Sequence, residues 1–416
     1  MTGMLPNVLL ILLLNIQFDK QGARMSFFKF KNKLKKEKAS DVGIISYNIN
    51  TGAYNFGAAL HSYAFQKYLD KKNIDNIIVN YYSEGTRRNF IYKKIINNVK
   101  KKNYKQLLPN IIRAYFITIK KIKFENFFRK NCNVTKNRYT IKTPPQLKKI
   151  GRFVCETDVT WCKTKYGFDK GFLCDLPNMK KKNNVAYSID FGSTLKSEED
   201  KKRIKKYAKN FKYISIRNAF KLEYFKEITG RNDAIITIDP VFLLDCEDYA
   251  PIIKPSGKSR EYLLVYNCKE NNQDMINCAK ICADKNNLQL KIINCHMDMS
   301  CNKIESFPTP LGIEEFLGYI KNAKYLYTNS FHGICFAIIF NIPFYAFART
   351  GNNEKILTLL EHFNLYDRMY SDENLIYPPP PTDLRKSKEI RQRLVHLRDI
   401  SEQFLNESII SSKEGV

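Results

Sequence analysis

The amino-acid sequence predicts an α/β protein built from two doubly wound domains, each a parallel sheet packed between helices. Short apolar runs typical of buried strands alternate with longer segments in which apolar residues recur at helical spacing. Polar loops rich in Gly, Ser, Asn and Asp follow several of the expected strands. A segment with Pro, Gly and Ser at 251–258 divides the 416 residues, which suffice for two domains of ordinary size.

The first domain is expected to open with a strand, a polar loop, a helix and a second strand. Its helix follows from an apolar stripe in which Phe56, Leu60, Ala64 and Tyr68 recur every four residues. The expected strands are 42–47, 77–79, 185–189, 213–218 and 234–238, and the expected helices are 57–69, 198–210 and 219–228. The first loop lacks the G-x-G-x-x-G pattern, so the sequence carries no dinucleotide fingerprint there.

The second domain is expected to hold strands at 262–266 and 288–293 and helices at 275–285, 312–321 and 354–363. Between them, residues 323–347 predict a strand, a polar loop, a buried helix and a further strand. The loop includes Ser330, His332 and Gly333, and loops at strand carboxyl ends bind ligands in open α/β sheets. A helix starting near Gly333 would direct free N–H groups at an anion. The alternative is a hydrogen-bonded core histidine followed by a turn glycine.

The predicted organisation has four parts. Residues 1–40 form a leader and basic tail, 41–250 the N-terminal domain, 258–365 the C-terminal domain, and 366–416 a proline link and terminal helix. Lys, Arg and interleaved apolar residues at 84–150 predict a basic helical insertion in the first domain, either touching an anionic partner or merely solvated. The terminal helix, at 382–405 after four prolines, is expected to cross back over the first domain.

The net charge and the cysteines indicate which binding partners and which cellular compartment to expect. Lys and Arg number 69 against 41 Asp and Glu, a net charge of +28 that favours anionic partners, although frequent Lys and Asn also fit an AT-rich coding sequence. Among the eleven cysteines, Cys278 and Cys282 lie one helical turn apart, and Cys295, His296 and Cys301 are close in a loop, so a zinc site is one alternative. No C-x-x-C pair is present, and we expect no metal site and reduced thiols in a cytoplasmic setting. No nucleic-acid module is recognisable, and we expect no nucleic-acid partner.

The N-terminal segment has two interpretations. Residues 5–18 are apolar but too short for a confident membrane span, and they lack the flanks of a signal peptide, so Met25 is an alternative start. Aromatic residues among lysines at 27–38 suit peripheral contact with an anionic membrane, at the inner face of the cell membrane. A solvated, frayed tail is the equal alternative.

Six short segments carry recognisable motifs in order along residues 43–405. They are NFGAALHSYAFQ from Asn55, ETDVTW from Glu156, VAYSIDFG from Val185, SIRN from Ser215, IDPVFL from Ile238 and TNSFHG from Thr328. They resemble the polysaccharide pyruvyl transferase family, whose corresponding patterns are N-Y-G-N-x-L-Q-x-Y-A-L-Q, G-S-D-x-x-W, I-S-Y-A-A-S-F-G, S-V-R-E, L-D-P-T-x-L and T-D-S-F-H-G. The segment from Asn352 to Arg368 likewise resembles N-S-R-I…L-L…L-x-D-R.

The chain departs from these patterns at four positions. Glu156 stands for the usual Gly, Asn218 for Glu, His61 for Gln and Asn329 for Asp. Glu156 places a bulky anion where the family has bare backbone, which keeps a degenerate, inactive relative as one alternative.

The resemblance implies a GT-B-like fold of two Rossmann-like domains and transfer of pyruvate from phosphoenolpyruvate to sugar hydroxyls, with no further cofactor. The acceptor would be a lipid-linked saccharide or a surface polysaccharide such as an exopolysaccharide of the cell envelope. Two rivals remain, namely a GT-B glycosyltransferase that uses a nucleotide sugar and a non-enzymatic nucleic-acid-binding protein.

The charges of phosphoenolpyruvate and the proton transfers of the reaction point to candidate residues for the donor site. Arg217, at the end of a strand, is the side chain best suited to bind a carboxylate or phosphate bidentately. His332 is the candidate general acid and base because its ordinary pKa lies near neutrality. Ser330 and Gly333 are expected to help hold the phosphate, so the expected catalytic residues are His332 and Arg217 and the donor site adds Ser330 and Gly333.

On the acceptor side, Asn55, Gly57, Asp158 and Asp190 are expected to hold or orient the sugar. For Asp158 the alternative is a helix cap or turn residue. Asp239, which precedes a proline, is expected to be a structural turn residue.

Overall fold

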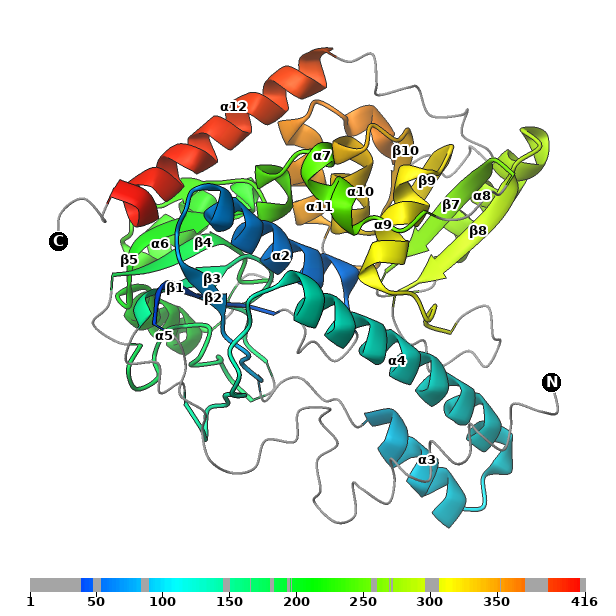
Figure 1. Cartoon of the computed structure of the whole chain (residues 1–416), viewed down its shortest axis with the longest axis horizontal. Coiled ribbons are helices and arrows are strands. Elements are labelled where there is room, and N and C mark those ends of the chain that lie inside the picture. Colours follow the sequence, from blue (N-terminus) through cyan, green and yellow to red (C-terminus); the bar gives the residue numbers. More distant parts are fainter. Residues whose placement is uncertain are drawn as a thin grey trace.

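The computed structural model describes residues 39–47, 54–83, 90–144, 150–164, 166–179, 183–192, 195, 197–255, 260–268, 270, 272–295, 307–351, 353–370 and 388–411. Two parallel sheets, each covered by helices, lie side by side, and the C-terminal helix runs from the second domain to the first (Figure 1). This confirms the predicted GT-B-like pair of α/β domains.

The first sheet has six parallel strands in the order β2-β1-β3-β4-β5-β6. Its strands are β1 (Ser40–Ile45), β2 (Asn76–Ile78), β3 (Ile150–Glu156), β4 (Asn184–Ile189), β5 (Phe211–Ile216) and β6 (Ile235–Ile236), and its helices include α2 (Phe56–Lys71), α5 (Glu198–Ala208) and α6 (Leu222–Thr229). Within the doubly wound class this is the flavodoxin-like order rather than the Rossmann order 3-2-1-4-5-6, and it places the switch point between β1 and β3.

The second sheet is also wholly parallel, in the order β11-β10-β9-β7-β8. Its strands are β7 (Tyr262–Asn267), β8 (Gln289–Asn294), β9 (Tyr325–Thr328), β10 (Phe344–Phe347) and β11 (Met369–Tyr370), and its helices are α8 (Gln273–Lys285), α9 (Ile313–Lys321), α10 (Phe331–Ile339) and α11 (Glu354–His362). The sheet repeats the connectivity of the first, with its switch point between β7 and β9. The short edge strand β11 has no counterpart among the predicted strands.

One hydrophobic core runs through both domains. In the first sheet, Ile44 faces α2 and Ile45 faces the opposite layer, because successive side chains alternate across a strand. The core on the α2 side continues into the second domain, where Phe56 of α2 stacks on Phe316 of α9 with ring centroids 4.3 Å apart. The two domains are therefore packed together along α2, and no open cleft separates them where α2 contacts α9.

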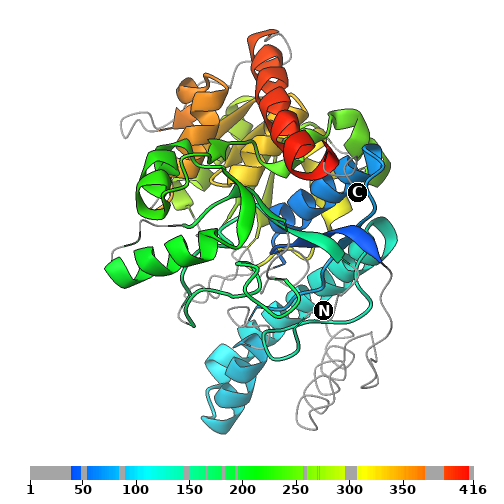
Figure 2. The same cartoon turned by 90° about the vertical axis from the view of Figure 1, so that its left-hand side faces the viewer.

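Two helices lie within the segment predicted as a basic insertion, α3 (Phe90–Lys100) and α4 (Tyr104–Asn131). The C-terminal half of α4 packs on both domains, since Phe124 contacts Phe56 of α2 and Lys123 forms an ion pair with Glu315 of α9. The N-terminal half of α4 and the whole of α3 extend away from the sheets (Figures 1 and 2). The exact domain boundaries stay a prediction.

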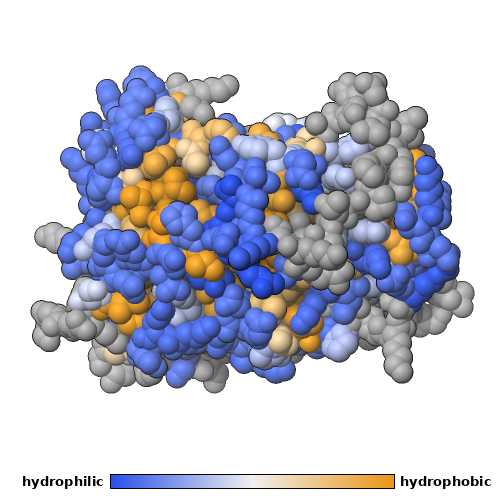
Figure 3. Space-filling view, turned by 90° about the horizontal axis from the view of Figure 1, so that it is seen from above, coloured by the Kyte–Doolittle hydropathy of each residue, from blue (hydrophilic) through white to orange (hydrophobic). Residues whose placement is uncertain are grey.

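The C-terminal helix α12 (Lys388–Leu405) packs on the first domain, as the sequence predicted. Phe404 lies against Tyr187 of β4 with ring centroids 6.2 Å apart, and the Ser401 hydroxyl accepts a hydrogen bond from the Ile238 N–H at 3.0 Å. The face of the molecule seen from above is mainly hydrophilic, with hydrophobic residues showing in smaller groups (Figure 3).

Several predictions fall on residues outside those described. These are the leader and basic tail at 1–38, the first part of the insertion at 84–89 and the prolines at 378–381. Within the described ranges, no helix combines the length and the apolar character needed to cross a bilayer. The cysteines of those ranges are free thiols, and most are buried.

Candidate functional site

The carboxyl ends of the two sheets meet where the domains join. Polar residues follow the strands there, namely Thr157 and Asp158 after β3, Asp190 after β4, Arg217 after β5, Asp239 after β6 and His332 after β9. Ligands of doubly wound sheets bind at this edge, outside the strand ends. The structure thus brings Arg217 and His332 together with both candidate aspartates, and we take this cluster as the candidate active site.

Arg217 lies at the centre of the cluster and is almost fully buried. Its Nη1 donates to Asp239 Oδ2 at 2.8 Å and to Thr157 Oγ1 at 3.2 Å. Its Nη2 lies 3.6 Å from Asp190 Oδ2 and 3.8 Å from Asp158 Oδ1, too far for hydrogen bonds. Among the described residues, Nε and Nη2 have no hydrogen-bond partner, so half of the guanidinium fork is available to an anion.

Charge–charge interactions dominate this cluster. Burial disfavours the carboxylates of Asp158 and Asp239, but the nearby cations outweigh burial and hold both pKa values well below their ordinary range. Burial likewise disfavours the charged form of Arg217, and the surrounding aspartates nevertheless raise its pKa. The site therefore holds a permanent cation among ionised carboxylates at neutral pH, and Asp239 is part of it as well as a turn residue.

The backbone after β3 adopts an uncommon conformation. Thr157 and Asp158 have φ of +26° and +59°, in the left-handed region that non-glycine residues rarely occupy. The Asp158 carboxylate accepts a hydrogen bond from the Val159 N–H at 2.9 Å, as a turn residue does. Its other interactions are with the site cations, so both roles considered for Asp158 are present in one side chain.

His332 projects from the first turn of α10 against the backbone of α2. A Cβ at Gly57 would lie 2.0 Å from His332 Nδ1, so a glycine is needed at 57 for the imidazole to fit. His332 Nε2 lies 3.6 Å from Asp239 Oδ2 and makes no hydrogen bond to the described residues. Burial lowers the pKa of His332 and outweighs the attraction of Asp239, which leaves the imidazole neutral near pH 7.

Three predicted site residues have structural partners. The Ser330 hydroxyl caps α10 by accepting from the Gly333 N–H at 3.3 Å, so that N–H is not free as expected. A Cβ at Gly333 would lie 2.7 Å from Thr328 Oγ1, which explains the glycine by packing rather than by approach of a ligand. Asn55 caps α2 in the same way, with its side-chain oxygen accepting from the Gly57 N–H at 2.8 Å.

The two departures at positions 61 and 156 form one buried cluster. His61 Nδ1 lies 2.8 Å from Glu156 Oε2, and the Ser62 hydroxyl donates to Glu156 Oε1 at 2.5 Å. All three side chains are inaccessible to solvent. Burial lowers the pKa of His61, but Glu156 outweighs burial and raises that pKa above its ordinary value. The His61 ring lies 6.0 Å from the His332 ring, between centroids, which makes this buried pair a neighbour of the candidate acid and base.

Sequence analysis missed further cations at this edge. Lys221 is buried, with Nζ 3.1 Å from Glu354 Oε2 and 3.7 Å from Asp190 Oδ1. Arg349, which follows β10, is also buried, and its Nε and Nη2 lack hydrogen-bond partners in the described part of the chain. Lys355 and Arg217 both lie over the Phe331 ring, 5.8 and 4.5 Å from its centroid. The position of Arg349 at a strand's carboxyl end was the available signal, the same one that identified Arg217.

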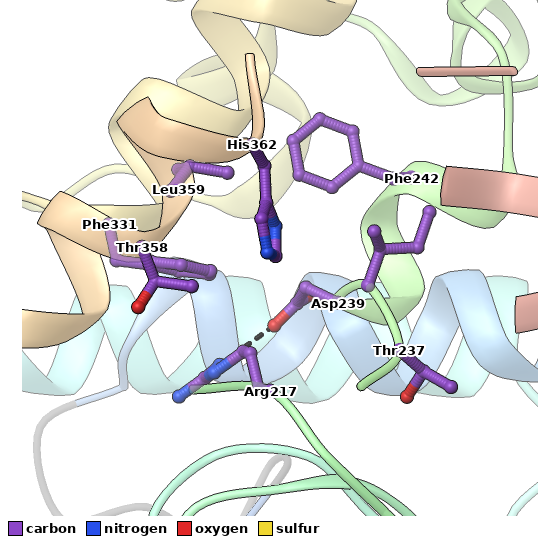
Figure 4. Close-up of a pocket in the computed structure, with 9 residues that line it drawn as sticks. Arg217, Thr237, Asp239, Phe242, Phe331, Thr358, Leu359 and His362 are labelled. Carbon is purple, nitrogen blue, oxygen red and sulfur yellow. Dashed lines mark hydrogen bonds and ion pairs between the residues drawn. The ribbon is translucent and has the colours of Figure 1, made fainter. Parts of the chain in front are cut away.

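A small cavity lies beside Arg217 (Figure 4). Its volume is about 10 Å³, room for about one water molecule. His362 of α11 points into it opposite the ion pair between Arg217 and Asp239, and Phe242 and Phe331 supply apolar walls. A substrate larger than water would therefore have to enter from another side or after the domains move apart.

The part of the chain that the structure describes contains no group of three or more His, Cys, Asp or Glu side chains placed to hold a metal ion. Cys278 and Cys282, one turn apart on α8, pack in the core of the second domain instead. His296 and Cys301, which follow Cys295, lie outside the described ranges.

Fold and site together define a two-domain α/β protein of the GT-B-like class with a buried site of basic and acidic side chains at the strand ends. The chain belongs to the polysaccharide pyruvyl transferase family, whose model matches residues 55–351. The matched region contains every predicted site residue and the switch point of the second sheet, between β7 and β9, whereas β1 of the first sheet lies before it. No curated protein matches the chain significantly.

Solved structures give distant matches. An uncharacterised protein from Klebsiella pneumoniae shows 11% identity and a TM-score of 0.35, covering 80% of this chain and 94% of its own. S. aureus MnaA with UDP gives 11% and 0.40, with coverage of 89% and 90%. The wall teichoic acid polymerase TagF gives 11% and 0.36, with coverage of 96% and 91%. Similarity at this level carries no information about the substrate of this chain.

Proposed function

We propose that this protein transfers pyruvate from phosphoenolpyruvate to sugar hydroxyls of a lipid-linked saccharide or surface polysaccharide, with release of phosphate. Family membership supports a polysaccharide pyruvyl transferase. The observation that supports phosphoenolpyruvate as the donor is the presence of two buried guanidinium groups, those of Arg217 and Arg349. Each has two nitrogens without a hydrogen-bond partner among the described residues. A carboxylate or a phosphate could accept hydrogen bonds from these nitrogens, because a guanidinium binds such groups bidentately.

The proposed reaction balances without a metal or redox partner. One sugar hydroxyl adds to the donor carbon that bears the phosphate, and a proton goes to the methylene carbon, which becomes a methyl group. A second hydroxyl attacks the same carbon, the carbon–oxygen bond to phosphate breaks, and the hydroxyl proton leaves with the phosphate. The product is a ketal across two hydroxyls.

His332 is proposed to move the first proton. Because its imidazole is neutral near pH 7, it can accept the proton of the attacking hydroxyl and pass a proton to the methylene carbon in the same step, so that no carbanion forms. Arg217 would bind the donor through Nε and Nη2, which lack hydrogen-bond partners among the described residues, and would stabilise the negative charge of the leaving phosphate. Asp158 and Asp190, which lie beside Arg217, would accept hydrogen bonds from the sugar.

Phosphate release tests this proposal. Purified protein is incubated with phosphoenolpyruvate and a panel of sugar acceptors, including lipid-linked ones, and compared with Arg217→Ala and His332→Ala. We expect acceptor-dependent release that falls by about a hundredfold or more in both variants. Arg391→Ala and His396→Ala, at exposed positions of α12, are the matched controls and should retain wild-type rates. Release that survives in both site variants would overturn the residue assignment.

Ligand binding to the same purified protein distinguishes the proposal from the rival functions. Ligand protection against thermal unfolding is measured with phosphoenolpyruvate and with a panel of nucleotide sugars. Protection by phosphoenolpyruvate that is lost in Arg217→Ala supports the proposed donor. Protection by a nucleotide sugar alone would replace the proposal with a glycosyltransferase. Donor binding without any turnover would indicate an inactive relative.

A further inference from the structure

The hairpin formed by α3 and α4 carries an unusual concentration of positive charge. Between residues 90 and 124 the sequence contains ten Lys or Arg and no Asp or Glu. The ten are Lys93, Lys94, Lys100, Lys101, Lys102, Lys105, Arg113, Lys120, Lys121 and Lys123. Lys121 and Lys123 pair with Glu125 and Glu315, but no acidic residue within this stretch balances the others, so the hairpin has a positive field of its own.

The closed end of this hairpin, residues 99–108, also exposes apolar side chains, and we call it the hairpin tip. Val99, Tyr104 and Leu108 are 54%, 66% and 53% exposed, although each is a residue type normally buried. The inner faces of the two helices are already packed, with Ile91 and Ile95 of α3 against α4. The three exposed side chains are therefore surplus to the packing of the hairpin.

Exposed lysines surround these apolar side chains. Lys100, Lys101, Lys102 and Lys105 all lie within the hairpin tip and are exposed. Basic side chains beside exposed apolar ones are the combination that binds the surface of an anionic bilayer, where lysines meet headgroups and apolar groups enter the acyl boundary. A nucleic acid would use the lysines but would leave an aliphatic pair such as Val99 and Leu108 in water.

The hairpin is firmly attached to the body that holds the candidate site. Lys120 of α4 is buried, lies 4.3 Å from the centroid of the Phe56 ring and donates to the Cys295 carbonyl at 3.2 Å. Phe124, one turn further, packs on the same Phe56 ring. Twenty residues of helix separate Phe124 from Tyr104, about 30 Å at 1.5 Å per residue. The hairpin tip thus extends well beyond the domains, as Figures 1 and 2 show.

We propose that the hairpin tip docks the protein on an anionic lipid surface, with its lysines on the headgroups and Val99, Tyr104 and Leu108 in the interface. This surface lies outside the candidate active site, and the proposal does not depend on which donor or acceptor the enzyme uses. Docking would keep the protein where lipid-linked acceptors are found.

Vesicle sedimentation of the full-length chain tests the proposal. Vesicles of phosphatidylcholine alone are compared with vesicles that also contain phosphatidylglycerol, at low and at high salt. We expect the protein to bind only the vesicles that contain phosphatidylglycerol, and we expect high salt to weaken this binding. Changing Lys100, Lys101 and Lys102 to Glu should lower the partition coefficient by on the order of a hundredfold, since each lysine near the surface contributes about fivefold.

Two further variants make the test specific. Changing Val99, Tyr104 and Leu108 to Ser should weaken the binding that survives at high salt. The matched charge control changes Lys202, Lys205 and Lys206 of α5 to Glu, three exposed lysines on the first domain, and should leave binding nearly unchanged. Thermal unfolding of each variant checks that the fold is retained.

Three results would overturn the proposal. If the hairpin-tip and α5 charge variants lost vesicle binding equally, the binding would depend on the net charge of the protein and not on the hairpin tip. Undiminished binding in both hairpin-tip variants would assign any membrane contact to another part of the chain. Binding to RNA that exceeds vesicle binding, with no effect of the Ser substitutions, would point to a nucleic-acid surface instead.

Discussion

The buried pair of His61 and Glu156 should behave as a unit when it is mutated. Both side chains are inaccessible to solvent, and the imidazole nitrogen and the carboxylate oxygen lie 2.8 Å apart. Removing one partner of a buried ion pair typically costs about 3–5 kcal/mol of unfolding free energy, because an unpaired charge stays buried. The perturbations are His61→Gln, Glu156→Gln and the double substitution.

The two single variants should differ. His61→Gln leaves a buried carboxylate whose remaining partner is the Ser62 hydroxyl, so we expect the cost of about 3–5 kcal/mol. Glu156→Gln leaves an imidazole that can lose its proton, so we expect a smaller cost at pH 8. In the double variant two neutral amides replace the pair, and its cost should fall short of the sum of the single costs by about 1–3 kcal/mol.

The pH dependence follows from the raised pKa of His61. A group whose pKa is higher in the folded state stabilises the fold fully below its unfolded value, here about 6.5. That contribution is lost as the pH rises through the folded-state pKa. The coupling between His61 and Glu156 should therefore be larger at pH 6 than at pH 9.

Urea unfolding followed by tryptophan fluorescence measures these energies. Trp161 is the single tryptophan of the chain and is buried in the first domain, between Phe211 and Phe225. The continuous core shared by the domains favours one cooperative transition, which coincident circular dichroism and fluorescence curves would verify. Single costs that add up in the double variant to within about 0.5 kcal/mol would refute the reasoning.

Three more outcomes are expected. Gly57→Ala forces a Cβ to within 2.0 Å of His332 Nδ1, so urea unfolding should show a loss of about 1–3 kcal/mol, and phosphate release should fall; an unchanged rate would separate His332 from the chemistry. Asp239→Asn should flatten the acid limb of the stability profile, because a depressed carboxyl pKa stabilises the fold above about pH 4 and is lost below it; parallel wild-type and variant profiles would contradict this. Ser401→Ala orphans the buried Ile238 N–H and should cost about 1–3 kcal/mol in urea unfolding, with an unchanged midpoint as the contrary result.

The fold was predictable because it depends on patterns that the sequence displays directly. Alternating strand and helix periods predicted both α/β domains. The polar loops at strand ends identified Arg217, Asp158 and Asp190 as candidates, and the structure shows that they lie close together. The strand order within each sheet was not predictable, since periodicity does not say which strands pair. The two-residue strand β11 is too short to leave a pattern.

The site was less predictable because burial of a charge leaves no local signal. Arg349 and Lys221 are two among 69 basic residues, and their environments come from distant strands and helices. His61 and Glu156 were noticed separately as departures, but 95 positions separate them and their contact needs the fold. Asp239 was assigned a turn, which is correct for one carboxylate oxygen, while the other oxygen pairs with Arg217.

Helix α12 has a consequence for how the chain folds during synthesis. Phe404, Leu405 and Ile409, near the carboxyl end, belong to the same core as Val42 and Ile44 of the first strand. The N-terminal domain therefore cannot complete its core until residue 409 has left the ribosome. Until then its β4 surface lacks its final cover, so a nascent chain halted after the second domain would expose an apolar face to chaperones and to other nascent chains.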